Sequence, residues 1–249
     1  MREGRGFIFI FLLFFGFLSR RKAGNEAGFF CSEKEFPLIA YRLNLIIVRL
    51  AHVYGPYASQ WVATALSMAR VYKAIDEEMK WLWTKDLRTN TVHIHDVTRA
   101  LWAVTGWYTS GKANWDEKAM GPVPTFNLVD KGVTTQGVMA DLIAEIFGIK
   151  TGFQGQLIST FARLNMDSVV DDVNDELLGP WADLLQDAGI TRPGPLTPFM
   201  EKELLKDTDL SMDGNRLEQV VGFEYEKPKM SKELLEEVIE SYKKMKWWP

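Results

Sequence analysis

A continuous run of mostly β-branched apolar residues, Leu45 to Val48, constrains the fold of this chain more than any other feature. Such a run suits a parallel strand that helices cover on both faces. Ligands of open α/β sheets bind just past the carboxyl ends of the strands. We therefore expect the strand Leu45–Leu50 to end at one wall of a small-molecule site. The polar and turn residues that follow the run are Arg49, His52, Tyr54, Gly55 and Pro56.

Two further segments are expected to form strands, and a third, before Leu45, is expected to form a helix. Thr125–Val129 is a second buried apolar run, and Thr91–Asp96 alternates between polar and apolar residues as a short strand does. Glu33 to Arg42 has helical spacing, and it would be the end of a crossover helix that feeds the strand Leu45–Leu50.

Helices are expected where apolar residues recur with a period near 3.6 behind a capping side chain. The spacing predicts a helix from Ser59 to about Ala74 whose inner face includes Trp61 and Tyr72. A Pro/Gly-rich connector is expected over Arg192–Pro198. The other expected helices are Asp96–Val104, Thr134 or Thr135 to Phe147, Gln156–Ala188 with a break at Gly179-Pro180, Asn215–Val220, and Ser231–Met245.

Composition excludes several classes of partner. The formal net charge is -4 with mixed signs, so no basic stripe indicates nucleic-acid binding. Cys31 is the only cysteine, which excludes a disulfide framework and favours a reducing, cytoplasmic compartment. The three histidines and one cysteine show no metal-ligand spacing, so no metal site is expected.

The apolar run Phe7–Leu18 differs from the rest of the chain and has three interpretations. It contains 12 residues flanked by basic side chains, whereas a membrane-spanning helix needs ~20 apolar residues. It is a membrane anchor or signal-like leader, a buried helix or strand of the fold, or a segment not selected for structure. We take residues 1–31 as a hydrophobic leader outside the fold and residues 32–249 as the folded part, with membrane association through Phe7–Leu18 as the alternative to a cytoplasmic protein.

The chain contains four blocks in this order: Leu45–Pro56, Thr91–Val97, Thr125–Thr135 and Val221–Ser231. Together they are similar to the second half of an extended short-chain dehydrogenase/reductase of the NAD-dependent epimerase/dehydratase group. The resemblance implies an α/β fold in which part of a Rossmann-like, doubly wound sheet carries a mostly helical C-terminal substrate domain.

The resemblance also implies a cofactor and site residues. It implies NAD or NADP near Leu50 and His52, and a carbonyl or hydroxyl compound near His52, Tyr54, Arg88 and His93. Sugar-nucleotide members of the family carry Asn where this chain has His52, and an Arg for the diphosphate where it has Thr89. A substrate without a diphosphate, as in steroid- and flavonoid-type reductases, is therefore an equal candidate.

Two catalytic features of the family are missing from the chain. No G-x-x-G-x-x-G occurs in a strand–turn–helix setting, although that turn holds the cofactor pyrophosphate. The Tyr-x-x-x-Lys acid/base pair is absent because its two registers hold Asn25 with Phe29, or Ala27 with Cys31. We expect a truncated form that does not catalyse the family reaction. The alternative is a non-catalytic interaction protein, tethered to a membrane by Phe7–Leu18.

Several residues also have purely structural interpretations. Arg49 suits an ion pair, and Asp96 suits a helix cap better than a catalytic role. Arg88 and Lys85 face an anionic substrate or lie in a solvated loop. Three tryptophans suit either aromatic core or a pocket wall, namely Trp102, Trp107 and Trp115.

The strand Leu45–Leu50 is expected to pair with the strand around Phe126 on one side only. In the family its other neighbour belongs to the half that is missing here. An unpaired apolar edge templates association, so we expect aggregation, a homo-oligomer or dependence on a partner.

Overall fold

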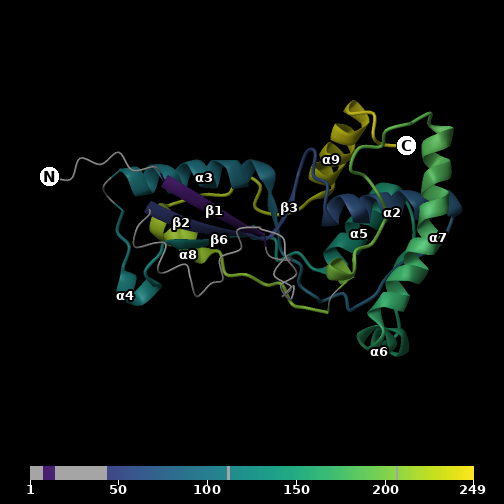
Figure 1. Cartoon of the computed structure of the whole chain (residues 1–249), viewed down its shortest axis with the longest axis horizontal. Coiled ribbons are helices and arrows are strands. Elements are labelled where there is room, and N and C mark those ends of the chain that lie inside the picture. The colour runs from purple at the N-terminus through teal and green to yellow at the C-terminus, as the bar shows by residue number, and fades with distance from the viewer. Residues whose placement is uncertain (1–7, 15–43, 111–112, 206) are drawn as a thin grey trace, which may run out of the picture.

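The computed structural model describes residues 8–14, 44–110, 113–205 and 207–249, and they form an α/β fold. A parallel sheet occupies one end of the molecule and a group of helices the other (Figure 1). This arrangement confirms the expected class, part of a Rossmann-like sheet with a helical domain. The crossover helix expected over residues 33–42 lies outside the described residues.

The main sheet has three parallel strands in the order β1-β2-β6, which are β1 (Ile8–Phe14), β2 (Asn44–Leu50) and β6 (Thr125–Leu128). Val48 of β2 lies opposite Phe126 of β6, as expected. Helix α3 (Ile94–Thr109) and helix α8 (Asn215–Val221) lie on opposite sides of the sheet (Figure 1). The apolar run of β2 is buried because both faces of the strand are covered.

The second edge of β2 corrects an expectation. β1 pairs with the whole of β2, from Ile8 opposite Asn44 to Phe14 opposite Leu50, so this edge is not open. Residues Ile8–Phe14 of the N-terminal apolar run are therefore a strand of the sheet. The expected boundary between residues 31 and 32 falls outside the described residues. Of the helices in the described ranges, none has the length and apolar character to cross a membrane.

The chain leaves the main sheet at Ala51 and joins a second one. The Ala51 N–H donates to Leu128 O at 3.0 Å, while the next N–H, that of His52, donates to Asn90 O at 3.2 Å. Strand β3 (His52–Tyr54) then pairs in parallel with β5 (Thr91–His93). The polar residues that follow β2 are therefore paired with β5, whereas β2 itself is paired with β6.

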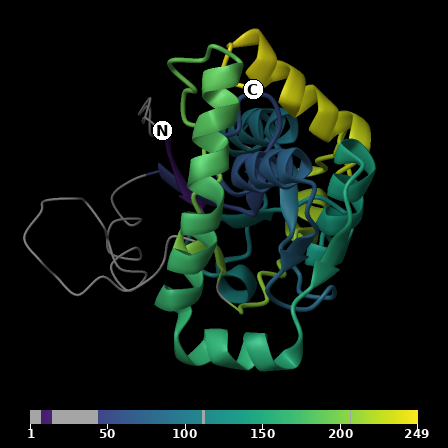
Figure 2. The ribbon, with the colours of Figure 1, turned by 90° about the vertical axis from the view of Figure 1, so that its right-hand side faces the viewer.

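The helical end of the molecule packs around one apolar core. A third sheet, of β4 (Met79–Trp81) and β7 (Thr151–Phe153), lies against it. Figure 2 shows α7 running nearly the full height of the view, with α6 at its lower end. The elements are α2 (Trp61–Ile75), α4 (Glu117–Met120), α5 (Gln136–Phe147), α6 (Gln156–Leu164), α7 (Met166–Asp187), the 3₁₀ turn η1 (Lys202–Leu205) and α9 (Lys232–Lys244).

Two of the expected helix caps are confirmed and two are wrong. Thr135 accepts from the Val138 N–H at the start of α5, and Ser231 accepts from the Leu234 N–H at the start of α9. Gln60 rather than Ser59 precedes α2, and it makes no side-chain cap. Asp96 is not a cap, because His93 takes that position and its Nδ1 accepts from the His95 N–H.

The break in the long helical region is also elsewhere. Gly179-Pro180 lies inside α7, and the chain bends instead at Asn165, where φ is -141° and ψ is 66°. The missing N–H of Pro180 costs one helical hydrogen bond, which a 22-residue helix tolerates when Leu177 and Trp181 are buried on either side. Arg192–Pro198 forms neither helix nor strand, as expected.

Candidate functional site

The candidate site lies where β3 and β5 continue past the carboxyl end of β2, and we call it the strand-end site. It comprises His52, Tyr54, His93 and Asp130, with Trp61 from the start of α2. Parallel pairing sets His52 opposite Thr91 and Tyr54 opposite His93. The side chains of these two pairs therefore share one face of the sheet that β3 forms with β5. The sequence therefore brings three of its predicted site residues together.

His52 stacks on Trp61. The two ring centroids are 4.9 Å apart with an angle of 23° between the planes. Burial lowers the pKa of His52 from 6.5 to about 4, so the imidazole is neutral at pH 7. A neutral imidazole offers one donor and one acceptor, which suits a carbonyl or hydroxyl group better than an anion.

Tyr54 and His93 form the buried part of the site. Their rings meet edge to face at 5.1 Å, and both side chains are nearly inaccessible to water. His93 Nδ1 accepts from the His95 N–H, so the neutral ring carries its proton on Nε2. His93 Nε2 and the Tyr54 hydroxyl are buried, and neither has a hydrogen-bond partner among the described residues.

Burial also moves the pKa values of these two groups. It lowers the pKa of His93 and raises that of Tyr54, which Asp130 and Asp96 raise further. Both groups are therefore neutral at pH 7 and keep their protons for hydrogen bonding.

Asp130 is a buried acid behind this pair. Its carboxylate accepts from Thr91 Oγ1 at 2.7 Å and from the Gly132 N–H at 2.9 Å. Burial nevertheless raises the pKa of Asp130 from 3.8 to about 6, and the nearby charge of Asp96 adds to the effect. Asp130 can therefore gain or lose a proton within a unit or so of physiological pH.

Asp96 positions the C-terminal segment rather than a ligand. Its fully buried carboxylate accepts from the N–H groups of Glu226 and Lys227, at 3.0 and 2.7 Å, and from Arg99 at 2.7 Å. The carboxylate thus joins the start of α3 to the segment between α8 and α9.

The basic residues predicted at the substrate lie apart from the buried cluster. Arg88 is exposed, and its guanidinium pairs with Asp209 at 2.6 Å. Lys85 is also exposed. Thr89 is buried, and its hydroxyl donates to Thr134 O at 3.3 Å. Neither Arg88 nor Lys85 therefore has a described contact with the buried part of the strand-end site, whereas the charge of Lys227 acts on His93 and lowers its pKa.

The described residues do not fit a whole dinucleotide. A Cβ on Gly55 would lie 2.6 Å from Ile94, and a Cβ on Gly132 would lie 2.9 Å from Lys229, so side chains fill the space beside both glycines that follow strands. Leu50 is buried in the apolar core, which leaves only its backbone for a contact with a cofactor. The two registers tested for Tyr-x-x-x-Lys fall outside the described residues.

Sequence reasoning missed two features of the site. Trp61 was expected on the inner face of α2, but its stacking on His52 was not. Asp130 lies two residues past the end of β6, and a carboxylate just beyond a strand end is a signal for a site at that edge of the sheet. Of the three other tryptophans, Trp107 and Trp115 pack on Phe126 as aromatic core, whereas Trp102 is 79% exposed and does not belong to the core.

Comparison with known proteins gives a likeness in fold. No family model matches the sequence, and no curated protein does. A point mutant of UDP-glucuronic acid 4-epimerase from Bacillus cereus, in complex with UDP-4-deoxy-4-fluoro-glucuronic acid and NAD, is similar over 96% of this chain and 62% of its own, with a TM-score of 0.50 and 12% identity. The likeness at this identity is one of fold alone.

Two further structures match at lower TM-scores. UDP-glucose 4-epimerase from Thermotoga maritima, with UDP-glucose, gives a TM-score of 0.44 and 19% identity over 85% of this chain. RMD from Pseudomonas aeruginosa, complexed with NADPH, gives 0.44 and 11% over 83%. The chain spans about half the length of each of these two structures.

Proposed function

We propose that this chain forms the substrate-side part of an NAD- or NADP-dependent epimerase, dehydratase or reductase, with His52 at the ligand. The observation that carries the proposal is the change of sheet at Ala51. It sets His52 past the carboxyl end of β2 and against Trp61, where open α/β sheets bind their ligands. The likeness in fold to the UDP-glucuronic acid 4-epimerase supports it.

The proposed substrate is a small carbonyl or hydroxyl compound without a diphosphate. His52 is neutral at pH 7, and Tyr54 and His93 hold unused hydrogen-bonding atoms. Thr89 is buried where a diphosphate-binding cation is expected, and Arg88 is neutralised by Asp209. These neutral donors and acceptors, beside the carboxylate of Asp130, suit an uncharged ligand, because an anion would lose its hydration without a compensating positive charge.

We propose further that the described residues do not complete hydride transfer by themselves. The glycines that follow their strands are packed against side chains, and a phosphate cradle needs open backbone N–H groups at a helix N-terminus. The alternative function is a non-catalytic interaction protein that keeps the strand-end site as a binding surface.

Calorimetric titration tests the proposal. We expect the full chain to bind an uncharged dihydroflavonol more tightly than UDP-glucuronic acid, and to bind NAD and NADP with Kd values weaker than about 100 μM. Micromolar binding of either dinucleotide would contradict the lack of a cradle. Equal or tighter binding of UDP-glucuronic acid would contradict the substrate class.

A pair of tryptophan variants ties the binding to the strand-end site. Trp61→Leu removes the ring that stacks on His52, and we expect it to weaken dihydroflavonol binding about tenfold, or about 1.4 kcal/mol. Trp102→Leu is the matched control, because Trp102 is exposed on α3. Equal effects of the two changes would show that the ligand binds elsewhere.

A further inference from the structure

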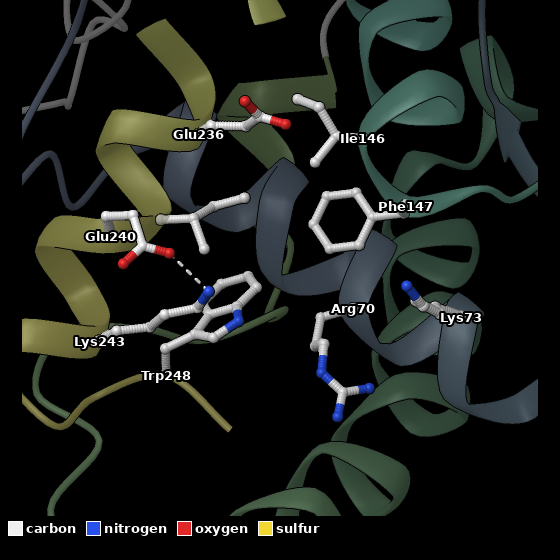
Figure 3. A pocket seen from close by; sticks show the side chains of 9 residues that line it. Arg70, Lys73, Ile146, Phe147, Glu236, Glu240, Lys243 and Trp248 are labelled. Carbon is white, nitrogen blue, oxygen red and sulfur yellow. Dashed lines mark hydrogen bonds and ion pairs between the residues drawn. The ribbon is translucent and has the colours of Figure 1, made fainter. Parts of the chain in front are cut away.

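A second cavity lies in the helical end of the molecule, and we call it the helix cavity. It has a volume of about 550 Å³, within the range of small-molecule sites. Its walls come from α2, the end of α5, α9 and the segment after α9 (Figure 3). The residues that line it are Arg70, Lys73, Ile146, Phe147, Glu236, Ile239, Glu240, Lys243 and Trp248.

The helix cavity is separate from the strand-end site. Trp61 starts α2 and Arg70 lies nine residues later, which is about 14 Å along the helix axis at 1.5 Å per residue. None of the residues of the strand-end site lines the cavity.

Aromatic and aliphatic side chains form one side of the cavity. Phe147 and Ile239 are buried, and the Trp248 ring lies 6.3 Å from that of Phe147. Trp248 also stacks on Tyr242, with ring centroids 5.9 Å apart and an angle of 25° between the planes. Because Trp248 is held from two sides, it offers a flat, fixed surface for a planar ligand.

Two cations on α2 line the cavity, and no described aspartate or glutamate forms an ion pair with either. Arg70 and Lys73 are three residues apart and so share one face of the helix. Arg70 Nε donates at 3.0 Å to a carboxyl oxygen of Pro249, the last residue of the given chain, and its terminal guanidinium nitrogens remain for a ligand. Lys73 is exposed and forms no ion pair with a described residue. Lys243 is different, since it pairs with Glu240 at 2.6 Å.

Glu236 supplies an acceptor away from these cations. It lies beside Ile146 at one end of the view in Figure 3, and Arg70 lies at the other. Glu236 is exposed, and no described residue forms an ion pair with it. The cavity therefore combines a cationic end, an aromatic wall and an acceptor end.

We propose that the helix cavity binds a small planar aromatic carboxylate that carries a hydroxyl group at its far end. The carboxylate lies at Arg70 and Lys73, the ring against Trp248 and Phe147, and the hydroxyl donates to Glu236. A carboxylate with a guanidinium and an ammonium forms the stronger, charge-assisted class of hydrogen bonds. This inference does not depend on the function proposed for the strand-end site.

Calorimetry with 4-hydroxycinnamate tests this site on the full chain. We expect saturable 1:1 binding with a Kd below about 1 mM. The double variant Arg70→Gln/Lys73→Gln should weaken binding at least tenfold, whereas Lys118→Gln, a change of one exposed lysine on α4, should leave it unchanged. Trp248→Phe keeps an aromatic surface and should reduce affinity by less than the double variant.

Two further probes separate the parts of the proposal. The uncharged 4-hydroxycinnamyl alcohol should bind at least tenfold more weakly than the acid, and inorganic phosphate should not compete with the acid. The proposal is overturned if the acid gives no saturable heat up to several times 1 mM, if the double variant binds it normally, or if the alcohol or phosphate binds as well as the acid. Circular dichroism melts of each variant confirm that the binding data come from folded protein.

Discussion

Asp130 and His52 are titratable groups near the end of β2. Burial raises the pKa of Asp130 and lowers that of His52, so the two groups make stability depend on pH in opposite directions. The pKa of Asp130 rises from 3.8 to about 6, so the folded protein holds the proton more tightly than the unfolded chain, and stability falls as the pH rises from about 4 to about 6. The pKa of His52 falls from 6.5 to about 4, so stability rises over a similar range. The two trends oppose each other in the wild-type protein.

Asp130→Asn should therefore leave only the rise of stability with pH that the histidines cause. We expect the free energy of unfolding of this variant to rise between pH 4 and pH 6.5 by about 3 kcal/mol more than that of the wild type, from two pKa units at about 1.4 kcal/mol each. His93, whose pKa is also lowered by burial, makes stability rise with pH in both proteins and does not contribute to this difference. Urea denaturation at half-unit pH steps measures it.

The converse variant checks the assignment. His52→Gln removes the group that opposes Asp130, so its stability should rise less with pH than that of the wild type, or fall, between pH 4 and pH 6. Parallel pH profiles for wild type, Asp130→Asn and His52→Gln would contradict these assignments.

Asp96 illustrates a role that its local sequence does not reveal. Asp96→Ala would leave the N–H groups of Glu226 and Lys227 without their acceptor in a buried position, and Arg99 without one of its partners. We expect a loss of about 3 kcal/mol in the free energy of unfolding. Thermal and urea denaturation measure it, with Lys227→Ala as the control because it keeps the backbone N–H; similar losses in both would contradict the account.

At the scale of the elements, the sequence predicted those helix starts at which a side chain bonds to a backbone N–H only three residues away. Thr135 and Ser231 cap α5 and α9 as their sequences indicate, because the side-chain oxygen and the N–H it accepts from are only three residues apart. Asp96 bonds instead to N–H groups about 130 residues away, and no local pattern can indicate that. Helix α7 likewise continues through Pro180, where Leu177 and Trp181 are buried on either side, and the chain bends at Asn165 instead.

Helix α6 carries an apolar stripe that contributes little to the fold. Leu157 and Leu164 are 85% and 83% exposed, whereas Leu177 of α7 is fully buried. Leu157→Lys/Leu164→Lys should change the free energy of unfolding by less than about 0.5 kcal/mol. Leu177→Ala should cost about 2–5 kcal/mol, since it removes buried methyl groups and leaves a cavity.

Urea denaturation of the two variants compares these leucines directly. A large loss in the double lysine variant would mean that α6 packs against something in the folded protein. Size-exclusion chromatography of the same variant shows whether the exposed stripe drives association, and we expect the lysine variant to associate less than the wild type.

For the molecule as a whole, the sequence predicted the strands β2 and β6 and their pairing, because both are apolar runs that lie within blocks resembling the epimerase/dehydratase family. It did not predict the pairing of β1 with β2. Ile8 and Asn44 are 36 residues apart, and an apolar run such as Phe7–Leu18 fits a strand, a leader or an anchor equally well. The strand-end site was predicted in part, since His52, Tyr54 and His93 come together while Arg88 stays on the surface.

The proposed function depends on His52 being a neutral, half-buried group at a small-molecule site beyond the end of β2. Proton–carbon NMR of the imidazole rings tests it most directly, because the chain has three histidines and each gives its own signals. We expect the His52 signals to titrate with a pKa of about 4 and to shift when a dihydroflavonol is added. A His52 pKa near 6.5, with signals that do not move when the compound binds, would contradict it.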